Sequence, residues 1–199
     1  MRIASQGILN QDTEITFYFD SKPYKGFLGD TVASALLAND VHLVGRSFKY
    51  HRPRGILGIG SEEPNALISV HKGGRVEPNV RATVQEIYQG LIVTSQNSWP
   101  NLKFDALAIN DIAARFLSAG FYYKTFMWPP RFWEALYEPI IRRAAGLGRL
   151  DSKTDDDNYD QNFLFCDLLI IGGGPSGLLS ALLTARAGLD IILVDENAN

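Results

Sequence analysis

The feature that most constrains the fold lies in residues 166–199, CDLLIIGGGPSGLLSALLTARAGLDIILVDENAN. Residues 168–171 have the apolar composition of a buried strand, and they lead directly into the six residues GGGPSG at 172–177. A helical pattern follows up to about Ala187, and the apolar residues 191–194 predict a second strand. The segment therefore predicts a βαβ unit, the start of an α/β Rossmann-type dinucleotide-binding domain.

Each glycine of this turn has a physical reason. Gly172 permits the tight turn, Gly174 lets the backbone approach a pyrophosphate, and Gly177 allows the helix to pack closely on the strand. The amides and dipole at the start of the helix favour an anion. Glu196 ends the second strand and is expected to accept hydrogen bonds from an adenosine ribose, which favours NAD or FAD over NADP. The small-residue pattern, extended by Ala181, does not separate NAD from FAD.

The first hundred residues predict a small α+β domain in which a sheet wraps one helix. Residues 14–20 and 25–30 indicate two strands joined by a turn, and residues 29–40 indicate a short helix with Asp30 or Thr31 as its N-cap. Further strands are predicted from β-branched and apolar residues between turn signals, at 65–70, 82–88 and 90–96.

The middle of the chain changes character. Residues 105–120 have a helical apolar pattern, and residues 121–146 combine many aromatics with a Pro-Pro break. Five aspartates between residues 151 and 160 predict a solvated linker. The predicted organisation is a first domain, a helical and aromatic-rich connector with an acidic linker, and an incomplete dinucleotide-binding domain, at residues 1–100, 101–162 and 163–199.

Charge and cysteine content exclude several classes of function. With 19 Lys and Arg against 22 Asp and Glu, the net charge of −3 gives no general attraction to nucleic acid or to anionic membrane. The one cysteine, Cys166, cannot form an internal disulfide or hold a metal site alone, which fits a reducing cytoplasm. The most apolar window is interrupted by Asp167 and glycines, so no membrane span is predicted.

No catalytic group is predicted from the sequence. The three histidines, His42, His51 and His71, are scattered and none stands at metal-ligand spacing. Glu62 and Glu63 are adjacent, so their side chains point apart in an extended chain, and both are expected to face water.

A basic loop, RSFKYHRPRG, follows the predicted helix. Its cations are Arg46, Lys49, Arg52 and Arg54. They either solvate a turn or, in the case of Arg52 or Arg54, bind a carboxylate or a flavin phosphate at a subunit interface.

Over essentially all 199 residues the chain resembles the N-terminal part of the α subunit of heterotetrameric sarcosine oxidases. The resemblance lies in GDTVASALLANDVHLVGRSFKYHRPRG, EEPNALI and IIGGGPSGLLSALLTARAG…ILVDE. It implies an α+β ferredoxin-like (β-grasp) domain, similar to plant-type [2Fe-2S] ferredoxins, before the dinucleotide-binding domain. In cluster-bearing relatives the loop after the helix supplies closely spaced cysteines, whereas this chain has none before Cys166. The fold is therefore expected without an iron-sulfur cluster.

The resemblance also implies a function. The family oxidises sarcosine to glycine with O2, forms H2O2, and passes the one-carbon unit to tetrahydrofolate as 5,10-methylenetetrahydrofolate. NAD is expected in this chain, with FAD as the alternative. FAD, covalent FMN and zinc are expected elsewhere, in a complex with β, γ and δ-type subunits. The candidate cofactor-binding residues are Gly172, Gly173, Gly174, Pro175, Ser176, Gly177, Asp195, Glu196 and Asn197; relatives often have Arg where this chain has Asn197.

The chain ends just past the second predicted strand, whereas a dinucleotide fold needs further strands and helices. The expectation is a fragment that is inactive alone. The alternative function is a non-catalytic docking or scaffold module of a related amino-acid dehydrogenase or oxidase complex, with the aromatic segment 121–139 binding partner subunits.

Overall fold

The computed structural model describes residues 9, 11–112, 114, 128–144, 148, 151–153, 158 and 160–195. The chain forms two compact units, residues 1–153 and residues 154–199, and each is described here by itself. No helix in these described segments is both long and apolar enough to cross a membrane.

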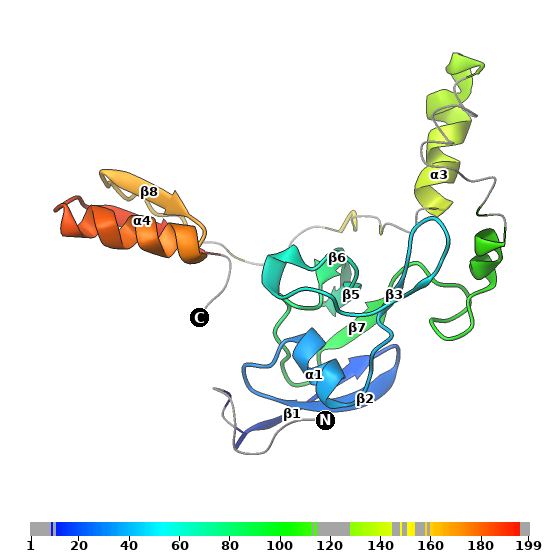
Figure 1. Ribbon diagram of the computed structural model, residues 1–199, viewed down its shortest axis with the longest axis horizontal. Coiled ribbons are helices and arrows are strands. Elements are labelled where there is room, and N and C mark those ends of the chain that lie inside the picture. Colours follow the sequence, from blue (N-terminus) through cyan, green and yellow to red (C-terminus); the bar gives the residue numbers. More distant parts are fainter. Residues whose placement is uncertain are drawn as a thin grey trace. The chain divides into compact units, whose positions relative to one another are not determined.

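The first unit is built on a five-stranded sheet with the order β2-β1-β7-β5-β6 (Figure 1). Its strands are β1 (Glu14–Phe19), β2 (Lys22–Phe27), β5 (Leu67–Lys72), β6 (Arg75–Arg81) and β7 (Ile92–Ser95). Strand β1 pairs antiparallel with β2 and parallel with β7, and β5 pairs antiparallel with both β6 and β7. Alternate residues of β1, namely Ile15, Phe17 and Phe19, are buried, as expected for a sheet with one face on the core.

Helix α1 (Val32–Ala38) supplies the other side of this core. It begins with a capping box, in which the Thr31 side chain accepts from the Ser34 amide and the Ser34 hydroxyl accepts from the Thr31 amide. Its apolar residues, including Val32 and Leu36, are buried in the same core as the strands. A sheet packed on one helix confirms the predicted α+β fold, and the strand order is that of a β-grasp.

One strand was predicted at the wrong place. Residues 82–88 form turns and an isolated bridge rather than a strand, and the strand that follows β5 in the chain is β6, whose sequence RVEPNVR contains Pro78. Strand β6 lies at the edge of the sheet, where a missing amide donor costs no ladder hydrogen bond. A proline is typical of a turn, but it is also compatible with an edge strand, and Pro78 lies in an edge strand here.

Short elements complete the first unit. They are β3 (Gly45–Arg46), which pairs antiparallel with β4 (Pro53–Arg54), the 3-10 helices η1 (Gly60–Glu62), η2 (Ala106–Asp111) and η3 (Pro130–Phe132), the π-helix η4 (Trp133–Tyr137) and helix α3 (Glu138–Ala144). Of the helix predicted at residues 105–120, the described part forms η2, and most of the rest lies outside the described residues.

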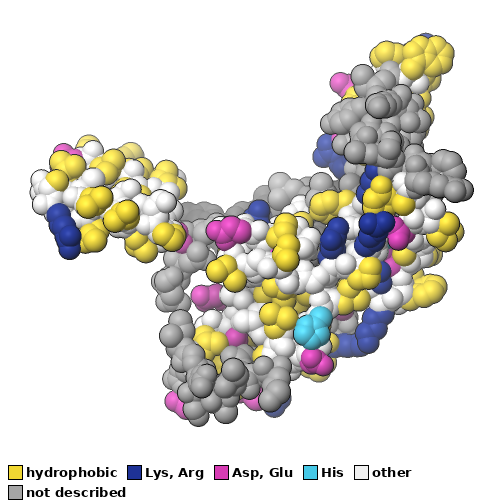
Figure 2. Space-filling view, viewed as in Figure 1, with side chains coloured by type: hydrophobic (Ala, Val, Ile, Leu, Met, Phe, Trp, Pro, Cys, Tyr) yellow, Lys and Arg dark blue, Asp and Glu magenta, His cyan; other side chains and the backbone are white. Residues whose placement is uncertain are grey.

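The second unit is the predicted βαβ unit. Strand β8 (Leu168–Ile171) and strand β9 (Ile191–Val194) are parallel and in direct register, and helix α4 (Pro175–Arg186) connects them. Apolar side chains are spread over the surface of this unit (Figure 2). The side chain of Ile171, for example, is 81% exposed, and the leucines of α4 are about half exposed. Exposed apolar surface of this kind is typical of a site that contacts other protein or a ligand.

Candidate functional site

The glycine-rich turn between β8 and α4 has the geometry that its sequence predicts. Gly172 has a φ of +106°, a conformation that side-chain-bearing residues rarely adopt. A Cβ atom on Gly177 would lie 1.9 Å from the carbonyl oxygen of Gly172, so the start of the helix touches the turn closely. Both positions therefore require glycine for structural reasons.

Gly174 differs from these two glycines. It is the N-cap of α4, its φ is −65°, and a Cβ atom there would meet no atom of the described residues within 4 Å. Open space beside the backbone at the N-terminus of a twelve-residue helix is what a pyrophosphate needs. Within the part of the chain that the structure describes, no side chain caps this helix end, and Pro175 at its first position has no amide, so the amides of the next residues can face a ligand.

Asp195, which follows β9, reaches this turn. Its carboxylate accepts a hydrogen bond from the Gly173 amide. The structure therefore brings together the candidate residues 172–177 and Asp195. Glu196 and Asn197 lie outside the described residues. An acid next to an anion-binding turn suits the hydroxyl groups of a ribose, which donate hydrogen bonds to carboxylates.

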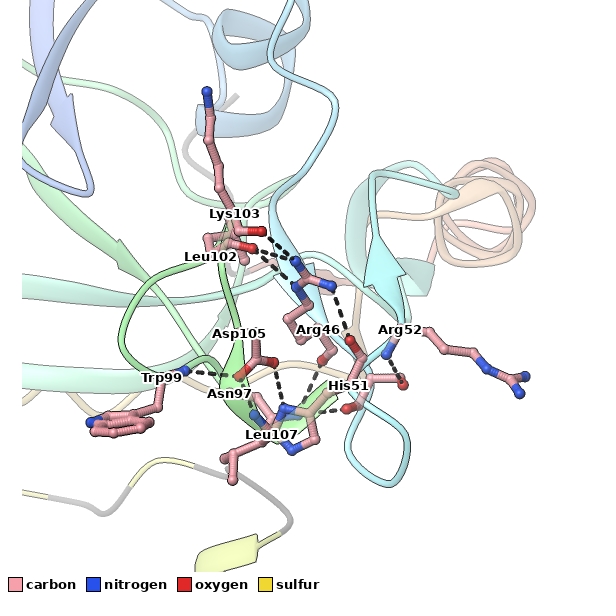
Figure 3. A network of polar contacts seen from close by, with 10 residues as sticks. Arg46, His51, Arg52, Asn97, Trp99, Leu102, Lys103, Asp105 and Leu107 are labelled. Atoms are coloured by element: carbon pink, nitrogen blue, oxygen red, sulfur yellow. Dashed lines mark hydrogen bonds and ion pairs between the residues drawn. The ribbon is translucent and has the colours of Figure 1, made fainter. Parts of the chain in front are cut away.

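The basic loop of the first unit is held in place by hydrogen bonds that one of its own cations, Arg46, donates. The Arg46 guanidinium donates to the carbonyl oxygens of Leu102 (2.7 and 3.0 Å), Lys103 (3.1 Å) and His51 (3.1 Å) (Figure 3). Four bonds to backbone carbonyls make Arg46 a structural residue that joins the loop to residues 102–103. This role was not predicted.

Arg52, a second cation of this loop, forms an ion pair with Asp111. Its Nε atom lies 2.7 Å from the Asp111 carboxylate, whose hydrogen bond and charge raise the pKa of Arg52. Both Lys49 and Arg52 lie over the ring of Tyr50, with distances of 4.9 and 4.8 Å to its centroid. In the described part of the chain, the exposed Arg54 side chain has no ion pair or hydrogen bond. Arg54 is therefore the cation of the loop best placed to meet an outside anion.

The histidine of this loop, His51, is buried. The Nδ1 atom of His51 donates to the Asp105 carboxylate at 2.7 Å, and both side chains are at most 1% exposed. The other oxygen of Asp105 accepts from the amides of Trp99 (3.1 Å) and Leu107 (3.2 Å). Asp105 thus joins the segment after β7, residues 99–107, to the basic loop through these hydrogen bonds (Figure 3). No local pattern in the sequence points to this pair, because its members are 54 positions apart.

Glu63 is the residue on which the prediction was wrong. Glu62 is exposed, as predicted, but the Glu63 side chain is buried, and its carboxylate accepts four backbone hydrogen bonds. Burial raises the pKa of this carboxyl, but the four amide bonds outweigh burial and hold its pKa below the usual value. Glu63 is therefore a buried carboxylate within the loop that leads to β5.

Comparisons with known proteins agree with both units. Residues 12–98 match the family described as 2Fe-2S iron-sulfur cluster binding domain, and residues 165–199 match the family described as FAD binding domain. The fold and these matches indicate a class: the first unit is similar to a ferredoxin-like domain, and the second unit is similar to part of a FAD-binding domain.

Individual proteins with similar sequences indicate a more specific relationship than the family matches. The chain is 57% identical over 197 residues to the sarcosine oxidase subunit alpha of Rhizobium meliloti (strain 1021), covering 99% of this chain and 20% of that protein. It is 31% identical over 191 residues to the sarcosine oxidase subunit alpha of Corynebacterium sp. (strain U-96), covering 94% of this chain and 15% of that protein. The chain is therefore homologous to the sarcosine oxidase subunit alpha, which confirms the resemblance, and it spans about a fifth or less of these relatives' length.

The crystal structure of L-proline dehydrogenase from P. horikoshii is a more distant match. Its TM-score is 0.46 at 17% identity, and the match covers 92% of this chain and 25% of that chain. A likeness at this level carries no argument about function.

The residues of the first unit do not fit the metal centre that the matched family implies. A [2Fe-2S] cluster is held by four cysteines, or by two cysteines and two histidines. Residues 12–98 contain no cysteine, because the chain's one cysteine is Cys166. Within the described residues, no group of three or more His, Cys, Asp or Glu side chains is placed to hold a metal. By contrast, the glycine-rich turn fits the pyrophosphate of a dinucleotide.

Proposed function

We propose that this chain is part of the alpha subunit of a multi-subunit sarcosine oxidase and that its glycine-rich turn binds NAD. The observation that carries the proposal is the 57% identity to a sarcosine oxidase subunit alpha over 197 residues. The geometry of residues 172–177 supports the dinucleotide, because it combines a strained glycine turn, open space and a helix N-terminus.

The proposed reaction converts sarcosine, O2 and tetrahydrofolate into glycine, H2O2 and 5,10-methylenetetrahydrofolate. Two hydrogens leave the methylamine group and reduce O2, and the methyl carbon passes to tetrahydrofolate. The partners are β, γ and δ-type subunits, which carry FAD, FMN and zinc. A location in the cytoplasm is part of the proposal, and a chain with one cysteine is compatible with a reducing compartment.

In this assembly the residues of the chain bind and orient the cofactor. A bound nicotinamide ring can accept or donate a hydride. The amides at the start of α4 and the helix dipole stabilise the pyrophosphate, while Gly174 allows the close approach. Asp195 and Glu196 accept hydrogen bonds from the ribose, and their charge disfavours the 2′-phosphate of NADP. FAD is the alternative occupant, because residues 165–199 match a FAD-binding family.

The proposed domain organisation has three parts: a first domain at residues 1–100, a connector at residues 101–162 and a dinucleotide-binding segment at residues 163–199. The exposed apolar residues of β8 and α4 support an incomplete dinucleotide-binding domain, which further strands and helices would cover. The chain alone is therefore expected to be inactive, and the activity belongs to the assembly.

A non-catalytic docking role is the second candidate. It is favoured by exposed apolar residues in the aromatic connector, such as Trp128 (80% exposed) and Leu136. The two candidates differ in what happens to the bound NAD: a redox role changes its absorbance at 340 nm during turnover, and a scaffold role does not.

The test of the proposed function uses the purified assembly that contains this chain. Sarcosine is added with tetrahydrofolate under air, and glycine, H2O2 and O2 uptake are measured together. Equal amounts of glycine and H2O2 are expected. Assemblies loaded with flavin that do not oxidise sarcosine would refute the proposal.

A further inference from the structure

The connection from the end of α1 to the start of β5, residues 39–66, contains only the short elements β3, β4 and η1. Long loops of this kind need something that fixes their shape, because ordering a backbone without a ladder of hydrogen bonds costs about 1–2 kcal/mol per residue. In this loop the fixing group is the buried side chain of Glu63, which is about 1% exposed.

The carboxylate of Glu63 lies at the centre of four backbone amides. Its Oε2 atom accepts from Leu57 (2.8 Å) and Gly58 (2.6 Å), and its Oε1 atom accepts from Asn65 (2.7 Å) and Ala66 (3.0 Å). The amides come from both sides of Glu63 in the sequence, so one side chain closes the loop on itself. The ten residues from 57 to 66 span about the same length of chain as the C-x4-C-x2-C motif that holds a plant-type cluster.

We propose that the Glu63 carboxylate takes the structural place of an iron-sulfur cluster, so that loop 57–66 keeps its folded shape with no metal. In a cluster site, closely spaced cysteines converge on one inorganic group; here closely spaced amides converge on one carboxylate. The match of residues 12–98 to a cluster-binding family, and the lack of any cysteine among them, are both explained by this replacement.

Contacts from other elements strengthen the loop around this carboxylate. Arg81, at the end of β6, donates to the carbonyl oxygen of Glu63 (3.2 Å), and Thr83 donates to the carbonyl oxygen of Gly60 (2.6 Å). The charged side chain of Arg81 thus contacts the backbone of Glu63, and the adjacent Glu62 is exposed. The four amides bind the carboxylate, whereas Arg81 and Thr83 join the loop to the end of β6 and the residues that follow it.

The first test is the variant Glu63→Gln, with Glu62→Gln as the matched control, in the full chain. A glutamine offers one oxygen to two of the four amides and turns its NH2 donor toward the other two. Hydrogen-exchange mass spectrometry of peptides that cover residues 57–66 is expected to show exchange at least about tenfold faster in Glu63→Gln, and no change in Glu62→Gln. Wild-type exchange rates in Glu63→Gln overturn the proposal.

The second test varies pH and keeps the proposal testable if Glu63→Gln does not fold. The pKa of Glu63 is lower in the folded chain than in the unfolded chain, so its contribution is fully present above the unfolded pKa, about 4.3. It is lost as the pH falls through the folded pKa. Protection of residues 57–66, corrected for the intrinsic rate, should fall in this acid range in the wild type. Protection that stays constant there contradicts the proposal.

The third test addresses the metal itself. Wild-type chain treated with a chelator is expected to keep the protection of residues 57–66 unchanged, and incubation with ferrous iron, sulfide and a thiol should leave no stoichiometric iron after desalting. Loss of protection in the chelator, or about two bound irons per chain after incubation, would show that a metal centre organises the loop.

Discussion

The pair of variants Gly174→Ala and Gly177→Ala separates binding of the dinucleotide from the shape of the turn that binds it. At Gly174 the new methyl group meets no atom within 4 Å among the residues that the structure describes, and the φ of −65° suits alanine. The loss of a favourable N-cap and the gain from a stiffer unfolded chain are each about 1 kcal/mol or less and oppose each other. The free energy of unfolding should therefore change by less than about 1 kcal/mol.

The same methyl group occupies the space where the pyrophosphate is proposed to lie. If it breaks two charge-assisted hydrogen bonds from backbone amides, the loss is about 3 kcal/mol or more, which raises the Kd of the dinucleotide more than about 100-fold. Gly177→Ala should act differently. Its Cβ atom would lie 1.9 Å from the backbone oxygen of Gly172, so the turn itself must move, and the melting temperature should fall together with the affinity.

The assay is titration of NAD into cofactor-stripped assembly, together with thermal unfolding without NAD. Ser180→Ala, an exposed position on the same helix, is the control, and it should leave both quantities unchanged. If Gly174→Ala binds NAD with the wild-type Kd, the turn does not contact the pyrophosphate, and the reasoning from its geometry is refuted.

Three further predictions concern single side chains. Glu196→Ala should weaken dinucleotide binding by about 1–3 kcal/mol, measured by titration; unchanged affinity would mean that Glu196 only ends the strand. Asp105→Ala should lower the free energy of unfolding in urea by about 3 kcal/mol or more, since the buried His51 ring and two amides lose their acceptor; a loss below about 1 kcal/mol would contradict the buried pair. Arg54→Ala should reduce retention of flavin or partner subunits in the assembly more than Arg52→Ala, because Arg52 is already paired with Asp111. Equal retention in both variants would mean that the cations of the loop only face solvent.

Local pattern was enough to predict part of this molecule. The βαβ unit was predicted because residues 168–194 carry their own periodicity and turn glycines, and α1 was predicted from its cap and apolar spacing. The roles of Arg46 and Asp105 could not be predicted, because their partners lie more than 50 positions away.

Glu63 shows a different limit. The rule that adjacent side chains point apart holds for an extended chain, whereas Glu62 ends the 3-10 helix η1 and Glu63 is its C-cap. The rule also does not say which of the two side chains faces solvent. The sheet and the loop decide that, and they place Glu63 among backbone amides that no sequence pattern reveals. Strand β6 was missed for a related reason, since Pro78 is compatible with a turn and with an edge strand, and only the sheet order distinguishes them.

The central claim is that the turn of residues 172–177 holds NAD within a sarcosine-oxidising assembly. It is tested most directly by extracting the non-covalent cofactors of the purified assembly and identifying them by mass spectrometry. The account predicts about one NAD for each copy of this chain, as a single dinucleotide fold requires. An assembly that oxidises sarcosine but contains no NAD would contradict it.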